Sequence, residues 1–203
     1  MIEIYNFKVN FIKKSLFIPE LKFDKKGLYL IIGENGCGKT TFIRSILNIF
    51  KDYEGKILID GNENKKLSRK EIASKISYLP QEELTAFSLK VKDFINTGLY
   101  SVKENIFETI VDFLDLKSYL ELEYNSLSGG ERQLVRIARS LVAKVDYSLL
   151  DEPDTYLSRK NQERMLELFS HISKERSIVA ISHSKNHFSR FKNIDFEQYV
   201  KEN

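Results

Sequence analysis

The chain has 203 residues, 42% of them hydrophobic and 30% charged, with a formal net charge of +3 and a sequence pI near 8.7. This length suits one domain with a proper core, and the mixed composition excludes disordered and fibrous chains. The scattered basic residues predict no nucleic-acid partner, while one cysteine, Cys37, and the lack of a signal-peptide pattern predict a cytoplasmic location.

The N-terminal part of the chain predicts strands followed by a glycine turn and a helix. Apolar residues alternate in strand fashion over residues 2–11 and 15–23, and a strongly apolar run at 28–32 leads into glycines. Apolar side chains then recur at helical spacing from residue 40 to residue 50. The sequence therefore predicts the order strand, turn, helix.

The middle of the chain predicts two short strands and a helical segment. The strands cover residues 55–61 and 76–81, and the polar residues 62–70 between them are expected to form a solvated loop and a helix start. Strand signals vanish between residues 85 and 125, where two segments show helical spacing. We expect a small helical insertion there.

The C-terminal part returns to strand signals. Residues 146–150 and 177–181 are strand-like, and an amphipathic helix is predicted between them at 159–174. Alternating strands and helices predict an α/β fold with a largely parallel sheet and an N-terminal antiparallel part.

Residues 33–40 match the phosphate-binding pattern G-x-x-x-x-G-K-[ST], placed between an apolar strand and a helix. The glycines let backbone N–H groups converge on an anion, and the helix adds the positive end of its dipole. Lys39 supplies a charge for the β and γ phosphates, and the Thr40 hydroxyl can ligate magnesium. The structural alternative is a plain turn between strand and helix. The sequence thus predicts ATP and Mg²⁺ as ligands, held by Gly33, Glu34, Asn35, Gly36, Cys37, Gly38, Lys39 and Thr40.

The sequence also suggests roles for two adjacent acidic residues and for the cysteine. A buried-type strand ends in Asp151 and Glu152, whose side chains point different ways, so they can take different roles. We expect Asp151 to hold magnesium and Glu152 to polarise the attacking water. The alternative is a pair of helix-capping carboxylates before Pro153. We interpret Cys37 as a small side chain beside the nucleotide rather than a reactive thiol.

Residues 127–133, LSGGERQ, closely resemble the signature of the ATP-binding cassette ATPases. A serine and two glycines at a helix start make a second anion-binding end. The resemblance implies a P-loop NTPase fold in a single domain, 1–203, with its core at 1–84 and 126–203 and a helical subdomain at about 85–125. It also implies that Ser128, Gly129 and Gly130 face the ATP held by a second subunit.

Other positions can be carried over from the resemblance one at a time. Gln81 is similar to the glutamine that senses magnesium and water and moves with the coupling partner; a surface glutamine is the alternative. His183, after the apolar strand 177–181, is similar to the histidine that contacts the γ phosphate. Thr41 would add a hydroxyl near the α phosphate.

An aromatic side chain is expected to stack on the adenine ring. Phe11, 28 positions before Lys39, lies where the family has an aromatic side chain that stacks on adenine, but Phe7 and Tyr5 compete for this role. The chain departs from the family at Ser158, where an aspartate is usual, which bears on communication between subunits rather than on ATP binding.

The resemblance implies an ATPase subunit of a membrane transporter, in which ATP closes a head-to-tail dimer and a separate membrane-spanning permease contacts the cleft beside Gln81. Such a chain would lie on the cytoplasmic face of the cell membrane. Whether the dimer is homomeric or heteromeric stays open, and the lack of room for a regulatory domain favours export. The alternatives are a soluble cassette ATPase in macromolecular assembly and a regulatory module that binds nucleotide without hydrolysis.

Overall fold

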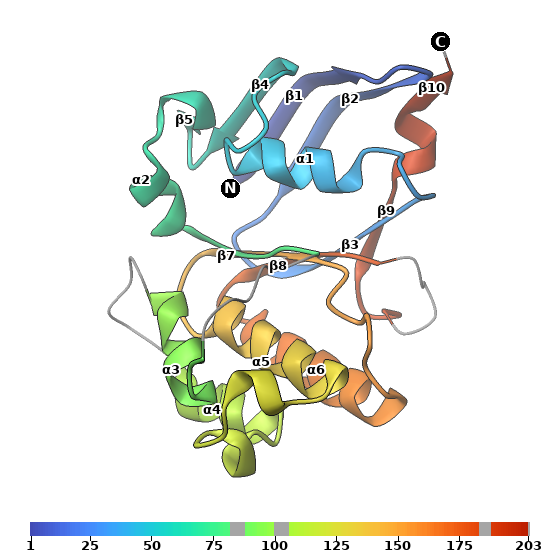
Figure 1. Cartoon of the computed structure of the whole chain (residues 1–203). Coiled ribbons are helices and arrows are strands. Elements are labelled where there is room, and N and C mark those ends of the chain that lie inside the picture. The colour runs from blue at the N-terminus through green and yellow to red at the C-terminus, as the bar shows by residue number, and fades with distance from the viewer. Residues whose placement is uncertain (82–87, 100–105, 183–187, 203) are drawn as a thin grey trace.

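The computed structural model describes residues 1–81, 88–99, 106–182 and 188–202. Within these residues the chain forms four stacked layers (Figure 1). An antiparallel sheet lies at one end, helix α1 (Lys39–Ile46) lies beneath it, a parallel sheet follows, and the remaining long helices cover the far face of the parallel sheet. The predicted α/β fold, with a parallel sheet and an N-terminal antiparallel part, is confirmed.

The antiparallel sheet has the strand order β10-β2-β1-β4-β5. Its centre is the hairpin of β1 (Ile2–Asn10) and β2 (Lys14–Phe23), whose alternating apolar residues turn one face toward α1. The other strands are β4 (Glu54–Ile59), β5 (Asn62–Glu63) and β10 (Val200–Glu202).

The parallel sheet has the strand order β6-β7-β8-β3-β9. All residues of the neighbouring interior strands β7 and β8 are buried, because layers pack on both faces of this sheet. The strands' carboxyl ends lie along one edge, where the phosphate loop and the acidic pair emerge. The strands are β3 (Gly27–Ile32), β6 (Ile76–Leu79), β7 (Tyr147–Asp151), β8 (Ser177–Ile181) and β9 (Lys192–Asp195).

Helices on the far face enclose a second core with that sheet. They are α3 (Val91–Asn96), α4 (Phe107–Phe113), α5 (Gly129–Leu141) and α6 (Arg159–Ile172), and the short helix α2 (Arg69–Ala73) precedes β6. The 3₁₀ turn after α3 approaches α5 so closely that a Cβ on Gly98 would lie 2.1 Å from the carbonyl oxygen of Arg139. The helical segment is thus packed against the helix that begins at the signature residues.

The structure refines several predicted boundaries. The helix predicted at 40–50 ends at Ile46. The segment 62–70 was expected to be solvated, but Asn64 is fully buried there. Short 3₁₀ helices cover Asn64–Lys66, Thr97–Leu99, Lys117–Tyr119, Tyr124–Ser126 and Phe196–Tyr199.

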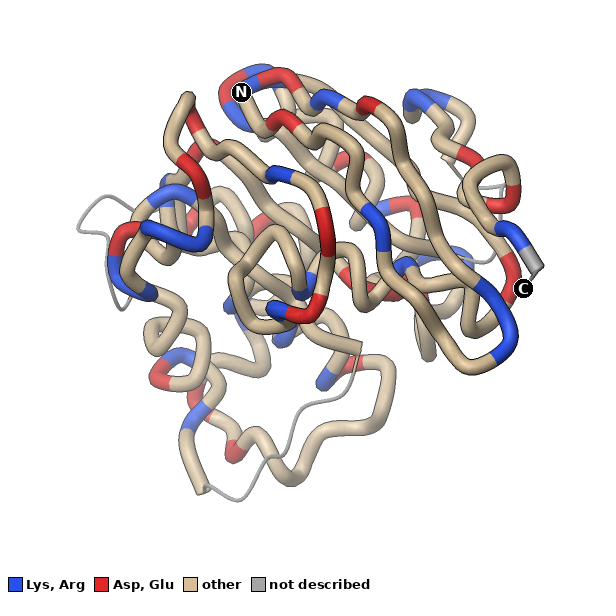
Figure 2. Tube along the Cα trace, turned by 90° about the horizontal axis from the view of Figure 1, so that it is seen from above, with Lys and Arg blue, Asp and Glu red and all other residues tan. Residues whose placement is uncertain are grey.

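Charges of both signs are interspersed over the chain trace (Figure 2). Among the described residues, no helix combines the length and the apolar character that crossing a bilayer requires.

Candidate functional site

The loop 33–40 links β3 to α1 and curls around the ammonium of Lys39. The Lys39 Nζ donates hydrogen bonds to the carbonyl oxygens of Gly33, at 2.7 Å, and Glu34, at 2.9 Å. Gly38 adopts a φ of 104°, and a Cβ there would lie 3.2 Å from the ring of Phe11, so only glycine fits comfortably. A buried cation thus lies at the start of α1, beside free space for a polyanion.

A pocket of about 670 Å³ opens at this loop. Three segments distant in the sequence meet the loop there: the β1–β2 hairpin, the end of β6, and the end of β7. The lining residues are Phe11, Asn35, Gly36, Gly38, Lys39, Thr40, Thr41, Gln81 and Glu152. Most residues expected to bind ATP therefore surround one cavity.

The structure distinguishes the three aromatic residues considered for adenine. Phe11 lines the pocket beside Gly38. Phe7 is fully buried and packs edge-to-face on Phe42 of α1, while the Tyr5 hydroxyl donates to the carboxylate of Glu3. Only the ring of Phe11 among these three borders the pocket.

Asp151 ends β7 with a buried carboxylate, 1% exposed. Burial raises its pKa, and the nearby Thr40 hydroxyl opposes this only in part. Both carboxylate oxygens lack a hydrogen-bond partner. Buried anionic oxygens without a partner, next to a threonine hydroxyl, fit a divalent cation such as Mg²⁺, whose preferred ligands are oxygens.

Glu152, the next residue, leaves the strand with a φ of 53°, which a bulky residue adopts only under constraint. Its backbone N–H donates to the carbonyl oxygen of Ile181, and its side chain lines the pocket. This turn separates the two carboxylates, so that Asp151 points into the protein and Glu152 faces the pocket.

The Cys37 side chain does not line the pocket. It is 1% exposed within the core around α1, and burial raises the pKa of its thiol. Only the backbone of Cys37 is left to contact nucleotide, and the thiol is in its unreactive form.

The signature residues begin α5 on a different part of the surface. Ser128 caps the helix in a reciprocal arrangement with Glu131: the Ser128 N–H and hydroxyl donate to the Glu131 carboxylate, at 2.8 and 2.7 Å. Apart from the local backbone of α5 itself, no atom lies within 4 Å of the Cβ position of Gly129, so the helix start is open there to an approaching group. Ser128, Gly129 and Gly130 do not line the pocket at Lys39.

Ser158 and His183 are two further positions that the sequence analysis named. Ser158 caps α6, its hydroxyl accepting a hydrogen bond from the Asn161 backbone N–H. His183 lies outside the described residues.

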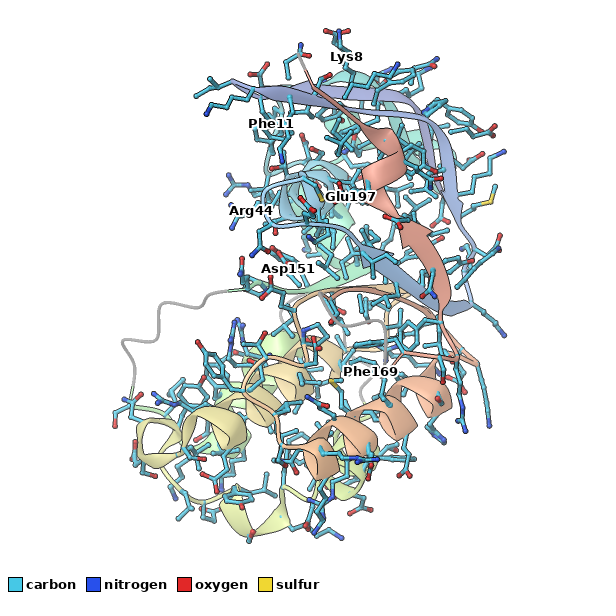
Figure 3. The ribbon with its side chains drawn as sticks, turned by 90° about the vertical axis from the view of Figure 1, so that its right-hand side faces the viewer. Lys8, Phe11, Arg44, Asp151, Phe169 and Glu197 are labelled. Atoms are coloured by element: carbon cyan, nitrogen blue, oxygen red, sulfur yellow. The ribbon has the colours of Figure 1, made fainter. Side chains whose placement is uncertain are left out.

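Three residues whose roles were missed by sequence reasoning contact the site. Gln133 of α5 donates to the carbonyl oxygens of Glu152 and Pro153, and Arg136 donates to those of Pro80 and Gln81. Glu197, near the C-terminus, accepts a hydrogen bond from the Glu34 backbone N–H. Figure 3 shows Phe11, Glu197 and Asp151 arranged around α1. Gln133 belongs to the signature segment 127–133, but no motif shows which groups these three residues meet, since the contacts join distant segments.

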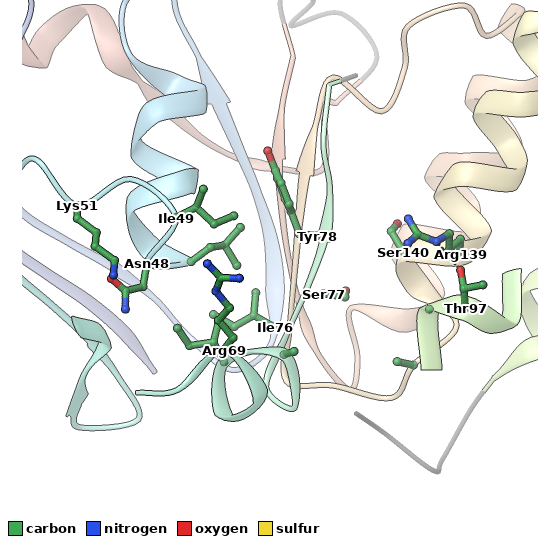
Figure 4. A pocket seen from close by; sticks show the side chains of 15 residues that line it. Asn48, Ile49, Lys51, Arg69, Ile76, Ser77, Tyr78, Thr97, Arg139 and Ser140 are labelled. Atoms are coloured by element: carbon green, nitrogen blue, oxygen red, sulfur yellow. Dashed lines mark hydrogen bonds between the residues drawn. The ribbon is translucent and has the colours of Figure 1, made fainter. Parts of the chain in front are cut away.

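A second pocket, of about 600 Å³, lies between the end of α1, β6 and α5 (Figure 4). We call it the α5 groove. Its walls combine apolar side chains, including the 62% exposed Ile49, with three cationic ones. The lining residues are Leu47, Asn48, Ile49, Lys51, Arg69, Ile72, Ala73, Ile76, Ser77, Tyr78, Thr97, Gly98, Arg139, Ser140 and Ala143.

Comparison with known proteins supports these observations. The family model described as ABC transporter matches residues 18–155. The chain is 31% identical over 183 residues to the iron(3+)-hydroxamate import ATP-binding protein FhuC of Bacillus subtilis, covering 84% of this chain and 68% of that protein. It is 30% identical over 192 residues to the petrobactin import ATP-binding protein FpuD of Bacillus anthracis, covering 88% and 70%.

A solved structure adds a fold comparison. The structure of a dimeric ATP-binding cassette in a post-hydrolysis state, bound to ADP and phosphate, superimposes with a TM-score of 0.81 at 20% identity. The match covers 96% of this chain and 94% of that one. At this identity the likeness concerns the fold alone.

Proposed function

The chain belongs to the ATP-binding cassette family of transporter ATPases, and from this premise we propose that ATP works by joining two cassettes head to tail. As a member of this family, the chain is an ATP-binding and ATP-hydrolysing transporter subunit. The alternative of a soluble assembly ATPase is not favoured, because the relatives compared above are named as import proteins.

The proposed dimer is supported mainly by one observation. The pocket at Lys39 gathers the phosphate loop, Gln81 and Glu152, but leaves Ser128 and its neighbouring glycines elsewhere on the surface. The open start of α5 offers N–H groups and a dipole to an anion that this chain's own pocket does not present to it. A second cassette would bring the start of its own α5 to the γ phosphate. The free energy of ATP binding would then stabilise the association of the two cassettes.

The roles of the pocket residues follow from their positions. The Lys39 ammonium exchanges its bonds to the loop carbonyls for bonds to the β and γ phosphates, and the ring of Phe11 stacks on adenine. Glu152 accepts a proton from the attacking water, and Gln81 orients that water. Mg²⁺ bound by Thr40 and Asp151 would neutralise charge on the phosphates.

The Ser128 hydroxyl is committed to Glu131 in the free chain. Contact with a partner's γ phosphate requires this hydroxyl to rotate, while the Ser128 N–H can keep its bond to Glu131. The capping box thereby holds the helix start in place and leaves one donor exchangeable.

The α5 groove is the proposed docking site for a short helix of a membrane-spanning permease. Its lining includes Tyr78, three residues before Gln81, and its apolar walls suit an amphipathic helix. This partner would hold the chain at the cytoplasmic face of the membrane. The relatives' names, which refer to import of iron(3+)-hydroxamate and of petrobactin, favour import over the export expected in the sequence analysis.

Substitution of Glu152 by glutamine tests this function. The variant is expected to bind ATP, lose turnover and accumulate as a dimer with ATP, because the base is removed while the phosphate contacts stay. Size-exclusion chromatography with and without ATP, with a phosphate-release assay, reads both effects. Glu167→Gln on α6 is the matched control. Turnover at the parental rate would refute the role of Glu152, and a monomeric ATP-bound variant would refute the dimer.

A further inference from the structure

Helix α5 contacts both catalytic segments through two side chains, that of Gln133 at the end of the signature segment 127–133 and that of Arg136 beyond it. Gln133 and Arg136 lie one turn apart on the face of α5 that meets the carboxyl ends of β6 and β7. Both sit between the signature residues at the start of the helix and Arg139, which lines the α5 groove.

Arg136 holds the segment that carries Gln81. Its Nη2 donates to the carbonyl oxygen of Pro80, at 2.7 Å, and to that of Gln81, at 3.3 Å. The Gln81 side chain itself is not engaged by these bonds, so it stays available to the pocket. A guanidinium suits this task because its planar fork can serve several acceptors at once.

Gln133 holds the turn that carries Glu152. Its Nε2 donates to the carbonyl oxygens of Pro153, at 3.1 Å, and Glu152, at 3.3 Å, and the side chain is 3% exposed. Arg136 Nη1 donates to the Gln133 Oε1 at 2.8 Å, which fixes the amide so that its N–H groups face the Glu152 turn. The two side chains therefore form one continuous chain of hydrogen bonds from Gln81 to Glu152.

We propose that Arg136 and Gln133 are positioning residues that set the distance between Gln81 and Glu152, and that α5 thereby couples the α5 groove to hydrolysis. This rests on the proposed function of Glu152 and Gln81. Arg139 and Ser140 of the same helix line the groove, beside Ser77 and Tyr78 of β6. A permease helix seated there contacts the two elements that the Arg136 fork joins, and a shift between them changes where Gln81 stands relative to Glu152.

Steady-state kinetics on the purified full chain tests the proposal with three variants. Arg136→Ala breaks the link to Gln81. Gln133→Glu keeps an acceptor for Arg136 but replaces the donor to the Glu152 turn by a carboxylate. Arg136→Lys keeps the charge without the fork. Arg164→Ala, which removes a helical arginine that pairs with Asp115, is the matched control.

The expected result is a fall in kcat of about tenfold for Arg136→Ala and Gln133→Glu, with the KM for ATP and the binding of a fluorescent ATP analogue unchanged. Arg136→Lys should restore little of the rate. The double variant should be no slower than the slower single variant, because both substitutions break one chain of bonds.

Two outcomes would overturn the proposal. One is hydrolysis by Arg136→Ala and Gln133→Glu at the parental rate. The other is a parallel loss of analogue binding and activity, which would mean that the two side chains support the pocket as a whole. Because the carboxylate of Gln133→Glu can still accept the hydrogen bond from Arg136, this variant keeps the test valid if Arg136→Ala does not fold. The Glu152→Gln variant tests the proposed function separately. If it is inactive while the parent hydrolyses ATP, the proposed function stands, whichever of these results the Arg136 and Gln133 variants give.

Discussion

The backbone N–H of Glu34, in the phosphate loop, donates a hydrogen bond to the carboxylate of Glu197, 163 positions later in the chain. The segment that carries Glu197 is itself anchored. The Glu197 N–H donates to Asp195 Oδ1 at 3.1 Å, and the fully buried Phe196 packs edge-to-face on Phe42 of α1. The C-terminal residues therefore hold the first turn of the phosphate loop from outside.

Replacing Glu197 by alanine should raise the KM for ATP about three- to tenfold, because the loop loses a charge-assisted bond that fixes its conformation. Glu197→Gln keeps an acceptor and should stay near the parental KM. Glu34→Pro, which removes the donor, should abolish the effect of Glu197→Ala when the two are combined. Titration with a fluorescent ATP analogue measures each affinity, and Gln198→Ala is the control. Equal affinities for Glu197→Ala and the parent would refute this role.

The buried carboxylate of Asp151 links stability to pH. Burial raises its pKa in the folded chain, so the group favours folding at low pH and loses that contribution as the pH rises through its folded pKa. At neutral pH, without a cation, Asp151 therefore costs stability, because its ionised form is disfavoured by burial while the unfolded chain ionises freely. Asp151→Asn should raise the melting temperature of the nucleotide-free protein at neutral pH, by about 2–4 °C per kcal/mol regained.

That gain should shrink as the pH falls toward about 4, where the carboxyl of the unfolded chain also protonates. The same variant should lose Mg²⁺-dependent ATP hydrolysis. Differential scanning fluorimetry across pH, with the exposed Asp52→Asn as control, measures the first effect. An Asp151→Asn variant that melts below the parent at neutral pH would contradict this account.

The parts of the site that the sequence predicted are those encoded by neighbouring residues. The loop at Lys39 and the capping serine at Ser128 depend on local backbone geometry, so their motifs contain the physical requirement. Arg136 and Glu197 act on segments 55 and 163 positions away, and only the folded chain shows which carbonyl or N–H each one meets. Asn64 was misjudged for the same reason, since its polar neighbours predict solvent while tertiary packing buries it.

Asn64 caps the far end of the nucleotide-binding helix. Its Nδ2 donates to the carbonyl oxygens of Ser45, at 2.6 Å, and Ile46, at 3.1 Å, and its Oδ1 accepts from the Tyr53 hydroxyl, at 2.8 Å. Asn64→Ala should reduce the free energy of unfolding by about 1–3 kcal/mol, because it leaves buried polar groups without partners.

Asn64→Asp should be worse at neutral pH, since it places a negative charge against the negative end of the α1 dipole. Urea unfolding at pH 7 and at pH 4 separates the two causes: protonation of the aspartic acid should recover part of the loss. Asn62→Ala, at an exposed position, is the control. Equal stabilities of the Asn64→Asp and Asn64→Ala variants at pH 7 would argue against the dipole contribution.

An exposed apolar side chain in the α5 groove predicts where the permease binds. Ile49 is 62% exposed on one wall of the groove, where an apolar side chain gains free energy only by being covered. Ile49→Asp should reduce capture of the membrane-spanning partner about tenfold or more, because it would place a charge in the contact.

Pull-down from detergent-solubilised membranes of the native host, quantified by mass spectrometry, reads this effect. Leu122→Asp is the matched control, since Leu122 is 45% exposed but lies outside the groove. Equal losses for both variants would show general surface sensitivity, and no loss for Ile49→Asp would place the permease elsewhere. A charge reversal at Arg69, Arg69→Glu, extends the test. The cationic wall of the groove is formed by Lys51, Arg69 and Arg139. If an acidic side chain of the docking helix faces this wall, Arg69→Glu should weaken capture of the permease more in low salt than in high salt.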